Sequence, residues 1–99
     1  MNIISKKALQ EFWGSYTNSK VSLQSWYSIT KKSEWENITE VKTTFPHADL
    51  VGKCTVFNIG GNKFRLITKI NYKRKIIYVR FVLTHNEYDR DKWKDDCEC

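Results

Sequence analysis

The sequence predicts an α+β fold in which N-terminal helices pack on a small antiparallel sheet and a short helical turn follows the last strand. Apolar residues recur at helical spacing in the first half of the chain and alternate with polar residues from Lys53 onward. Glycine and other turn residues separate the alternating segments, as in a meander of strands. The chain has 99 residues, which suffices for one modest core. We therefore expect a single domain over residues 1–92.

Two helices joined as a hairpin are expected first. Residues 1–4 are short and apolar, which is typical of an edge strand or an unstructured start. Ser5 is a candidate N-cap for the first helix, and Thr17-Asn18-Ser19 separates it from a second helix over residues 20–31. The expected buried positions are Leu9, Phe12, Trp13 and Tyr16 in the first helix and Val21, Leu23, Trp26, Tyr27 and Thr30 in the second.

A third helix is predicted before the sheet. Ser33 and Glu36 have the spacing of a capping box just ahead of further apolar residues. The helix is expected to end near Thr43, because the residue before Pro46 is pushed out of the helical region. Residues 47–50 then form a connecting loop to the first strand.

Three antiparallel strands are predicted over residues 53–58, 63–72 and 76–83. Gly60-Gly61-Asn62 supplies the positive-φ residues of the first hairpin loop, and Tyr72-Lys73-Arg74 forms the second turn. Alternation places the following residues on one face: Phe64, Leu66, Thr68 and Ile70 in the second strand, and Ile77, Val79, Phe81 and Leu83 in the third.

The opposite face of these strands is basic. It carries Lys63, Arg65, Ile67 and Lys69 in the second strand and Ile76, Tyr78, Arg80 and Val82 in the third. Cross-strand neighbours in an antiparallel sheet lie about 5 Å apart. Four polar side chains are therefore expected to share this face: Arg65, Lys69, Tyr78 and Arg80.

A short helical turn is expected directly after the last strand. Thr84 and Glu87 form a second capping-box pattern, and the turn that they start holds Tyr88. Residues 93–99 are highly charged and acidic, and only Trp93 has reason to pack. We therefore expect a frayed C-terminal tail.

The three cysteines do not have the pattern of a disulfide framework. Cys54 stands alone, and Cys97 and Cys99 lie at the C-terminus, where two thiols on a frayed end are expected to bind no metal. The two histidines are far apart in the sequence, and no carboxylate cluster accompanies them. We expect neither a metal nor another cofactor.

Basic residues are concentrated on the predicted strands. Between Lys53 and Leu83 there are five Lys and three Arg but no Asp or Glu, and the whole chain has a formal net charge of +6. RNA is the partner that fits this surface best, although an anionic membrane surface or an acidic protein also satisfies the charge. No apolar run approaches the roughly 20 residues that span a bilayer, and no signal-peptide core is present, so we expect a cytosolic protein without a membrane partner.

Arg65 and Arg80 are the principal candidates for binding phosphate. The planar guanidinium matches a phosphate bidentately and keeps its charge in any environment. The alternative interpretation is a half-exposed basic strand face without a specific ligand. Two arginines that converge beside Lys69 and Tyr78 favour the functional interpretation. The other candidate RNA contacts in the segment are Lys53, Lys63, Lys69 and Arg74.

His85 and Tyr88 are candidates for proton transfer at the edge of the same face. An imidazole with a pKa near 6.5 and a phenol can each donate or accept a proton at a reacting oxygen. The alternative is that Thr84 and Glu87 merely cap a turn in which Tyr88 packs. Both interpretations remain open from the residues alone.

These residue types suffice to cleave RNA without a metal. The ribose 2′-hydroxyl is the nucleophile, so the protein need only position the strand, remove one proton, neutralise the phosphorane and protonate the leaving oxygen. A metal-dependent nuclease is disfavoured because the basic segment has no acids to hold the ion. A serine or cysteine hydrolase is disfavoured because no Gly-x-Ser-x-Gly motif is present.

Several segments match one protein family when taken in order. They are Ile3-Ile4-Ser5-Lys6-Lys7-Ala8-Leu9, Val41-Lys42-Thr43-Thr44-Phe45-Pro46, the run Val56 to Leu66, Tyr78-Val79-Arg80, and Thr84-His85-Asn86-Glu87-Tyr88-Asp89. In this combination the chain resembles the HigB toxins of bacterial type II toxin–antitoxin systems. The resemblance covers residues 3 to about 90, and the ordered combination is far more specific than any single segment.

The resemblance implies a RelE/ParE-like fold, ribosome-dependent cleavage of mRNA in the A site, and neutralisation by a HigA-type antitoxin. It also implies products with a 2′,3′-cyclic phosphate and a 5′-hydroxyl. By matched position the implied site residues are Arg65, Arg80, His85 and Tyr88, with Lys69 as a secondary electrostatic group. Two other function classes stay open: a gyrase-directed toxin of the ParE type, and a non-catalytic module that binds RNA or DNA.

Overall fold

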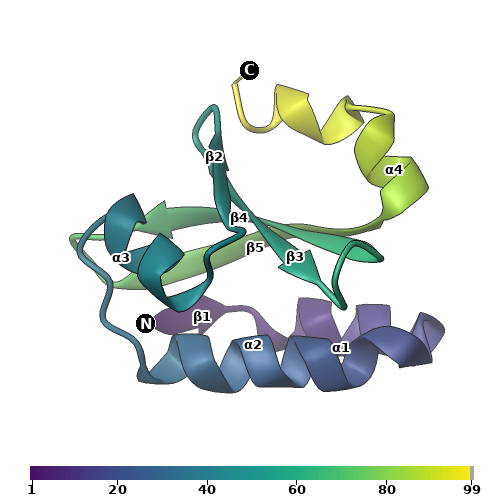
Figure 1. Ribbon diagram of the computed structural model, residues 1–99, viewed down its shortest axis with the longest axis horizontal. Helices are drawn as coiled ribbons and strands as arrows, with labels where there is room; N and C mark the ends of the chain where they lie inside the picture. The colour runs from purple at the N-terminus through teal and green to yellow at the C-terminus, as the bar shows by residue number, and fades with distance from the viewer. Residues whose placement is uncertain (99) are drawn as a thin grey trace.

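The computed structural model describes residues 1–98 and has the expected α+β arrangement, with helices packed on a five-stranded sheet (Figure 1). The helices are α1 (Lys6–Ser15), α2 (Lys20–Lys32), α3 (Ile38–Thr44) and α4 (His85–Asp89), with two 3-10 turns, η1 (Thr17–Ser19) and η2 (Lys92–Asp95). The strands are β1 (Asn2–Ile4), β2 (Asp49–Val51), β3 (Cys54–Ile59), β4 (Phe64–Asn71) and β5 (Ile76–Thr84). Among the described residues, no helix combines the length and the apolar character needed to cross a membrane.

The sheet has the strand order β1-β5-β4-β3-β2. The β3–β4 and β4–β5 hairpins are antiparallel, as predicted, and Gly60 and Gly61 of the first loop both have positive φ. Two edge strands extend this meander. β2 pairs antiparallel with β3, so the connecting loop expected over residues 47–50 is wrong where the strand begins at Asp49. β1 pairs in parallel with β5, so the sheet is mixed and not purely antiparallel.

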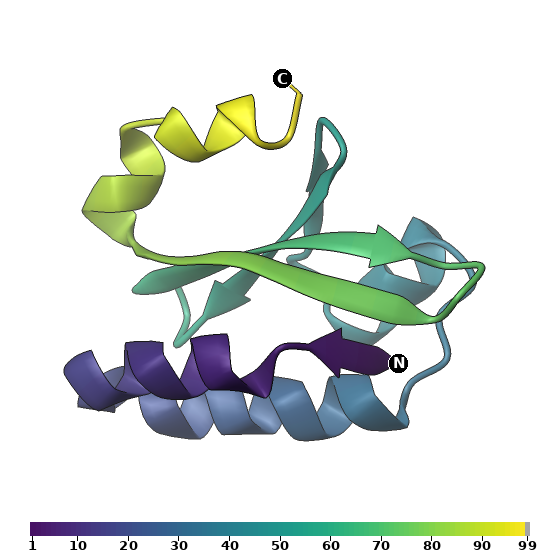
Figure 2. The same cartoon turned by 180° about the vertical axis from the view of Figure 1, so that it is seen from behind.

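The hairpin of α1 and α2 covers one face of the sheet, while α4 and the C-terminus lie on the other side (Figure 1, Figure 2). Phe57 of β3 joins the helices to the sheet. Its ring centroid lies 5.3 Å from that of Trp26, 6.3 Å from that of Trp35 and 5.4 Å from that of Phe45. Burial of a side chain of this size contributes about 1.5–3 kcal/mol, so this aromatic cluster is a principal source of stability.

Three details of the predicted helices are wrong. Tyr16, an expected buried position of the first helix, is 41% exposed and lies just after α1 ends at Ser15. Val21 is 78% exposed, because it lies two positions before the buried Leu23 and therefore points to the opposite side of α2. The cap of α3 is Asn37, whose side-chain oxygen accepts a hydrogen bond from the Glu40 N–H at 3.0 Å. Ser33, the predicted cap, instead ends α2.

A register shift interrupts the pairing of β4 with β5. Ile67 lies opposite Phe81 and Thr68 lies opposite Val79. Arg80, which lies between Val79 and Phe81, therefore has no residue opposite it on β4. An unpaired extra residue reverses the alternation of the side chains that follow it. Val82 therefore packs with the helices, whereas Leu83 packs on the opposite face, and the prediction that Ile77, Val79, Phe81 and Leu83 share one face is wrong beyond Val79.

The C-terminal segment covers the face of the sheet away from α1 and α2, so the prediction of a frayed tail is wrong for residues 93–98. Cys54, Val56, Ile67, Trp93 and Cys97 form a second, smaller core there. Cys54 and Cys97 are joined by a disulfide, which the cysteine pattern did not predict. Cys99 lies outside the described residues. The supposedly exposed basic face is therefore partly covered by the chain's own acidic end.

Candidate active site

The turn that carries His85 and Tyr88 is fixed by the predicted capping box. The Thr84 hydroxyl accepts a hydrogen bond from the Glu87 N–H at 3.3 Å, and the Glu87 carboxylate accepts one from the Thr84 N–H at 3.0 Å. β5 ends at Thr84, so α4 leaves the sheet without an intervening loop. His85 is thereby held at the end of the central strands.

Arg65 and Tyr88 are in contact. The guanidinium carbon of Arg65 lies 5.1 Å from the centroid of the Tyr88 ring, within the range of a cation–π interaction. Arg65 also donates to the Phe64 carbonyl at 3.2 Å and lies 3.5 Å from the Asn62 side-chain oxygen. These contacts hold the guanidinium in place while Arg65 stays partly exposed and able to meet a phosphate.

Trp93 holds Tyr88 in position through a ring stack and a hydrogen bond. The two rings stack with centroids 4.9 Å apart, and the Trp93 indole N–H donates to the Tyr88 carbonyl at 2.9 Å. Trp93 itself is buried in the second core. The packing of Trp93 was predicted, but its role as the support of Tyr88 was not.

Asp89 is a further candidate site residue, which the sequence interpretation missed. Its carboxylate lies 3.0 Å from His85 Nδ1, one helical turn earlier, and both side chains are more than half exposed. A carboxylate can only accept, so this contact favours the tautomer with the proton on Nδ1 and leaves Nε2 free to take up a proton. The spacing of four residues on a predicted helical turn was the available signal.

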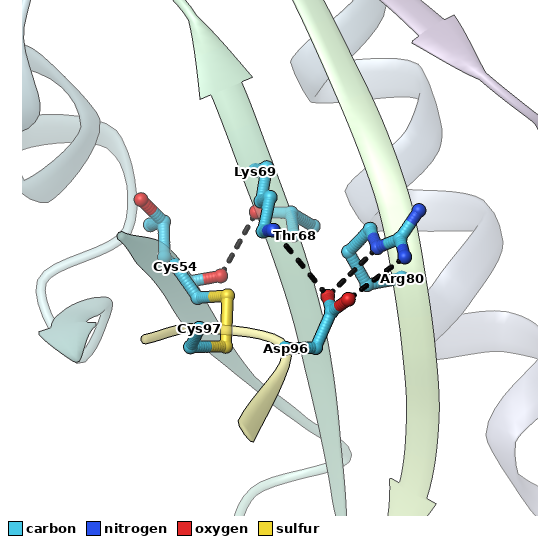
Figure 3. Close-up of a disulfide and its surroundings, with 7 residues drawn as sticks. Cys54, Thr68, Lys69, Arg80, Asp96 and Cys97 are labelled. Atoms are coloured by element: carbon cyan, nitrogen blue, oxygen red, sulfur yellow. Dashed lines mark hydrogen bonds and ion pairs between the residues drawn. A yellow bond between two sulfur atoms is a disulfide. The ribbon is translucent and has the colours of Figure 1, made fainter. Parts of the chain in front are cut away.

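Arg80 and Lys69 reach the same carboxylate from neighbouring strands (Figure 3). Arg80 donates to both oxygens of Asp96, at 2.8 and 2.9 Å, and Lys69 Nζ lies 3.7 Å from one of them. The hydrogen bond from Arg80 holds the pKa of the Asp96 carboxyl below its usual value, and the same bond raises the pKa of Arg80. The expectation that both cations lie on one face agrees with this geometry.

The other candidate RNA contacts are dispersed. Lys53 forms an ion pair with Glu98 at 2.7 Å, which lowers the pKa of that carboxyl. Lys63 is exposed just before β4, at the end of the sheet that bears Arg65. Arg74 lies in the β4–β5 turn, at the opposite end of these strands from His85. Arg74 is therefore not part of the cluster around α4.

The surface has two hollows of interest, one beside α4 and one beside the β3–β4 loop that holds Asn62. One, of about 200 Å³, lies between β5 and the C-terminal segment and is lined in part by Leu83, Glu87 and Trp93. The other, of about 500 Å³, is lined by aromatic and polar groups that include Phe45, His47 and Asn62. Rings and amides of this kind can stack on an unpaired base and hydrogen-bond to its edges. Within residues 1–98, no three His, Cys, Asp or Glu side chains are grouped so that they can hold a metal ion.

Comparison with known proteins identifies the family. A family model described as HigB_toxin, RelE-like toxic component of a toxin-antitoxin system, matches residues 19–91. The chain belongs to the HigB family. The resemblance seen in the sequence motifs is thus confirmed.

HigB relatives match almost the whole chain. The mRNA interferase HigB of Escherichia coli O6:H1 (strain CFT073) is 34% identical over 93 residues, which are 91% of this chain and 90% of that protein. The mRNA interferase toxin HigB of Escherichia coli K12 is 32% identical over 92 residues, 90% of this chain and 88% of that protein. The mRNA interferase HigB of Shigella flexneri gives the same values.

The candidate residues divide at the end of the segment that the HigB family model matches. Arg65, Arg80, His85 and Tyr88 lie inside it, and Asp89 does as well. Asp96 and Cys97 lie beyond its end. The acidic cover of Arg80 therefore lies beyond the segment that the family model matches.

Proposed function

We propose that this HigB-family protein is an endoribonuclease that cleaves mRNA on the ribosome and is neutralised by a HigA-type antitoxin. Relatives named mRNA interferase support the choice of substrate. The observation that carries the proposal is the contact between Arg65 and Tyr88, because it sets a phosphate-binding group beside the turn that bears His85. The protein then acts in the cytoplasm, where mRNA is translated.

In this proposal His85 is the general base. Nε2 removes the proton from the ribose 2′-hydroxyl, and Asp89 stabilises the imidazolium that results. The 2′-oxygen attacks the adjacent phosphorus, and Arg65 neutralises the charge that develops on the phosphorane oxygens. The Tyr88 hydroxyl protonates the departing 5′-oxygen. The products are a 2′,3′-cyclic phosphate and a 5′-hydroxyl, with Arg80 and Lys69 as electrostatic contacts to phosphate.

The open geometry of the site supports dependence on the ribosome. The His85 side chain is 52% exposed, and the groups around it line a surface instead of a closed cleft. In-line attack requires that the 2′-oxygen, the phosphorus and the leaving oxygen be aligned. A flexible single strand on such a surface is poorly aligned, so we infer that the A site supplies the positioning and the toxin supplies the chemical groups.

Primer extension on mRNA from cells after brief induction tests this function. Wild type and the matched control Asn86→Ala, an exposed α4 residue outside the proposed machinery, are expected to cut messages within translated frames. His85→Ala and Arg80→Ala are expected to leave them intact while still folding. Arrested growth with intact message and altered DNA supercoiling would contradict the nuclease function and favour a gyrase-directed toxin.

The partnership with an antitoxin is tested by co-expression. A small HigA-type protein encoded beside the toxin is expected to restore growth and to co-purify with the toxin. The acidic residues of such a partner would compete with RNA for the basic face. Growth arrest that persists although the two proteins co-purify would argue against neutralisation.

A further inference from the structure

The Asp96 carboxylate binds Arg80 and Lys69 in the way that a phosphate would bind them. Arg80 binds its two oxygens in parallel at 2.8 and 2.9 Å, the bidentate arrangement that guanidinium groups form with carboxylates and phosphates alike. Lys69 adds a second cation at 3.7 Å from the neighbouring strand. The Asp96 side chain is 24% exposed, so it covers these cations instead of extending into solvent.

The strap that brings Asp96 there, residues 93–98, is fastened at several points. Cys97 is bonded through its sulfur to Cys54 of β3, and its carbonyl accepts a hydrogen bond from the Lys53 N–H at 2.8 Å. Glu98 pairs with the Lys53 side chain at 2.7 Å. Figure 3 shows the disulfide directly beside the Asp96 cluster. The covalent bond adjacent to Asp96 therefore restricts how far its carboxylate can move from Arg80.

We propose that Arg80 and Lys69 form a subsite for an RNA phosphate, that Asp96 fills this subsite while the Cys54–Cys97 disulfide is closed, and that reduction by a dithiol vacates it. This inference rests on the function proposed above. In the redox step, two thiols of the reductant become a disulfide, and their two electrons and two protons convert Cys54 and Cys97 to free thiols. The toxin is thereby less active when oxidised and more active when reduced.

The strengths of the contacts explain why the disulfide can control the strap. Partly exposed ion pairs such as Arg80–Asp96 contribute only about 0–1 kcal/mol each, so they cannot by themselves exclude a polyanion. A covalent link raises the local concentration of the Asp96 carboxylate far above that of a competing RNA phosphate. Once the link is cut, RNA competes with a carboxylate that is held by non-covalent contacts alone: the packing of Trp93, the hydrogen bond from the Lys53 N–H to the Cys97 carbonyl, and the ion pairs.

Access of the reductant depends on opening of the strap. Both Cys54 and Cys97 are fully buried, so a thiolate reaches them only after the strap separates transiently from the sheet. Such opening is easiest in terminal segments, whose exposed backbone contacts break before the core does. Disulfides in cytosolic proteins are typically transient and redox-sensing, as this proposal requires.

Binding of a short 2′-O-methyl RNA, which has no free 2′-hydroxyl and cannot be cleaved, tests the strap separately from catalysis. The full chain in a Cys99→Ser background is compared oxidised and reduced, with the thiol content measured in each sample. Asp96→Asn removes the internal carboxylate, and Asp95→Asn is the matched control, since Asp95 is exposed and forms no ion pair among the residues that the structure describes. Cleavage on ribosomes is measured in parallel.

Reduction is expected to tighten RNA binding on the order of tenfold, which corresponds to about 1.4 kcal/mol. Oxidised Asp96→Asn should bind as tightly as reduced wild type, and oxidised Asp95→Asn should bind as weakly as oxidised wild type. Equal binding in both redox states would overturn the proposal that the strap blocks the subsite, whether or not the protein cleaves mRNA. A redox-dependent change in binding without cleavage in either state would instead overturn the nuclease function, while redox control of RNA binding by the strap would still hold.

Discussion

The guanidinium of Arg65 lies 5.1 Å from the centre of the Tyr88 ring, and Tyr88 in turn stacks on the buried Trp93 at 4.9 Å. This chain of contacts links β4 through α4 to the second core. Because α4 also carries His85, the same set of contacts positions the cation and the proposed proton-transfer groups relative to one another. The site therefore depends on the C-terminal segment as well as on the basic strands.

Arg65→Ala is predicted to lower the rate of mRNA cleavage on programmed ribosomes by about 100- to 1,000-fold, the usual effect of removing one donor that stabilises transition-state charge. Arg65→Lys should recover only part of the rate, because an ammonium lacks the planar fork. Single-turnover kinetics measure both. Lys20→Ala, which removes one exposed positive charge from α2 on the helical side, is the control and should cleave normally. A similar loss in that control would indicate a general charge effect.

Tyr88→Phe is predicted to retain the fold and lose the chemistry. The phenyl ring still stacks on Trp93 and under Arg65, so the unfolding midpoint should change little. The hydroxyl that protonates the leaving oxygen is missing, so the cleavage rate should fall by about 100-fold or more. Urea unfolding and single-turnover cleavage are compared on the same preparation. Full activity in this variant would remove Tyr88 from the mechanism and leave its ring as packing only.

Opening the disulfide is predicted to destabilise the protein by up to about 4 kcal/mol. Cys54 and Cys97 are 43 positions apart, and the chain-entropy model gives this value for a closed loop of that size. Urea unfolding of the oxidised protein and of the double variant Cys54→Ser, Cys97→Ser, in a shared Cys99→Ser background, measures the difference. Coincident unfolding curves would mean that the cross-link adds no stability.

Asp96 is predicted to stabilise the folded protein at neutral pH but not in strong acid. Its pKa in the folded state is lowered, chiefly by the Arg80 hydrogen bond, below the usual value of 3.8. The carboxylate therefore contributes fully above pH about 4, and this contribution is lost as the pH falls through the lowered folded-state pKa. Because the pair is partly exposed, we expect about 1 kcal/mol at most.

The pH dependence is measured as the difference in unfolding free energy between wild type and Asp96→Asn. This difference should be present at pH 7 and should shrink as the pH falls below the usual carboxyl pKa of 3.8. A difference that stays constant across this range would show that Asn disturbs the strap by some means other than loss of charge.

The parts of the site that sequence could predict are those set by near neighbours in the chain. Thr84 and Glu87 are three residues apart and cap α4 as their pattern indicates, so His85 and Tyr88 could be placed on a turn after the sheet. Asp89 was accessible by the same reasoning, since its contact with His85 spans four residues on one helix.

The parts that sequence could not predict depend on partners far along the chain. The parallel pairing of β1 with β5 joins Asn2–Ile4 to residues 76–78, and no local pattern encodes it. The bulge at Arg80 depends on how β5 pairs with β4, and the alternation of residues within β5 does not reveal it. The disulfide places an acidic segment over a basic face. Charge alone suggested that residues 93–98 remain in solvent, whereas burial of Trp93 and Cys97 brings Asp96 onto Arg80.

Cleavage of a ribosome-bound mRNA in which the nucleotide 5′ to the cut carries 2′-deoxyribose tests the proposed reaction most directly. Reduced wild-type protein is predicted to cut the all-ribose message, to leave a 2′,3′-cyclic phosphate, and to leave the substituted message intact. His85→Ala should cut neither message, and Asn86→Ala should behave as wild type. Cutting of the substituted message at an undiminished rate would contradict attack by the 2′-hydroxyl and, with it, the roles assigned to His85 and Tyr88.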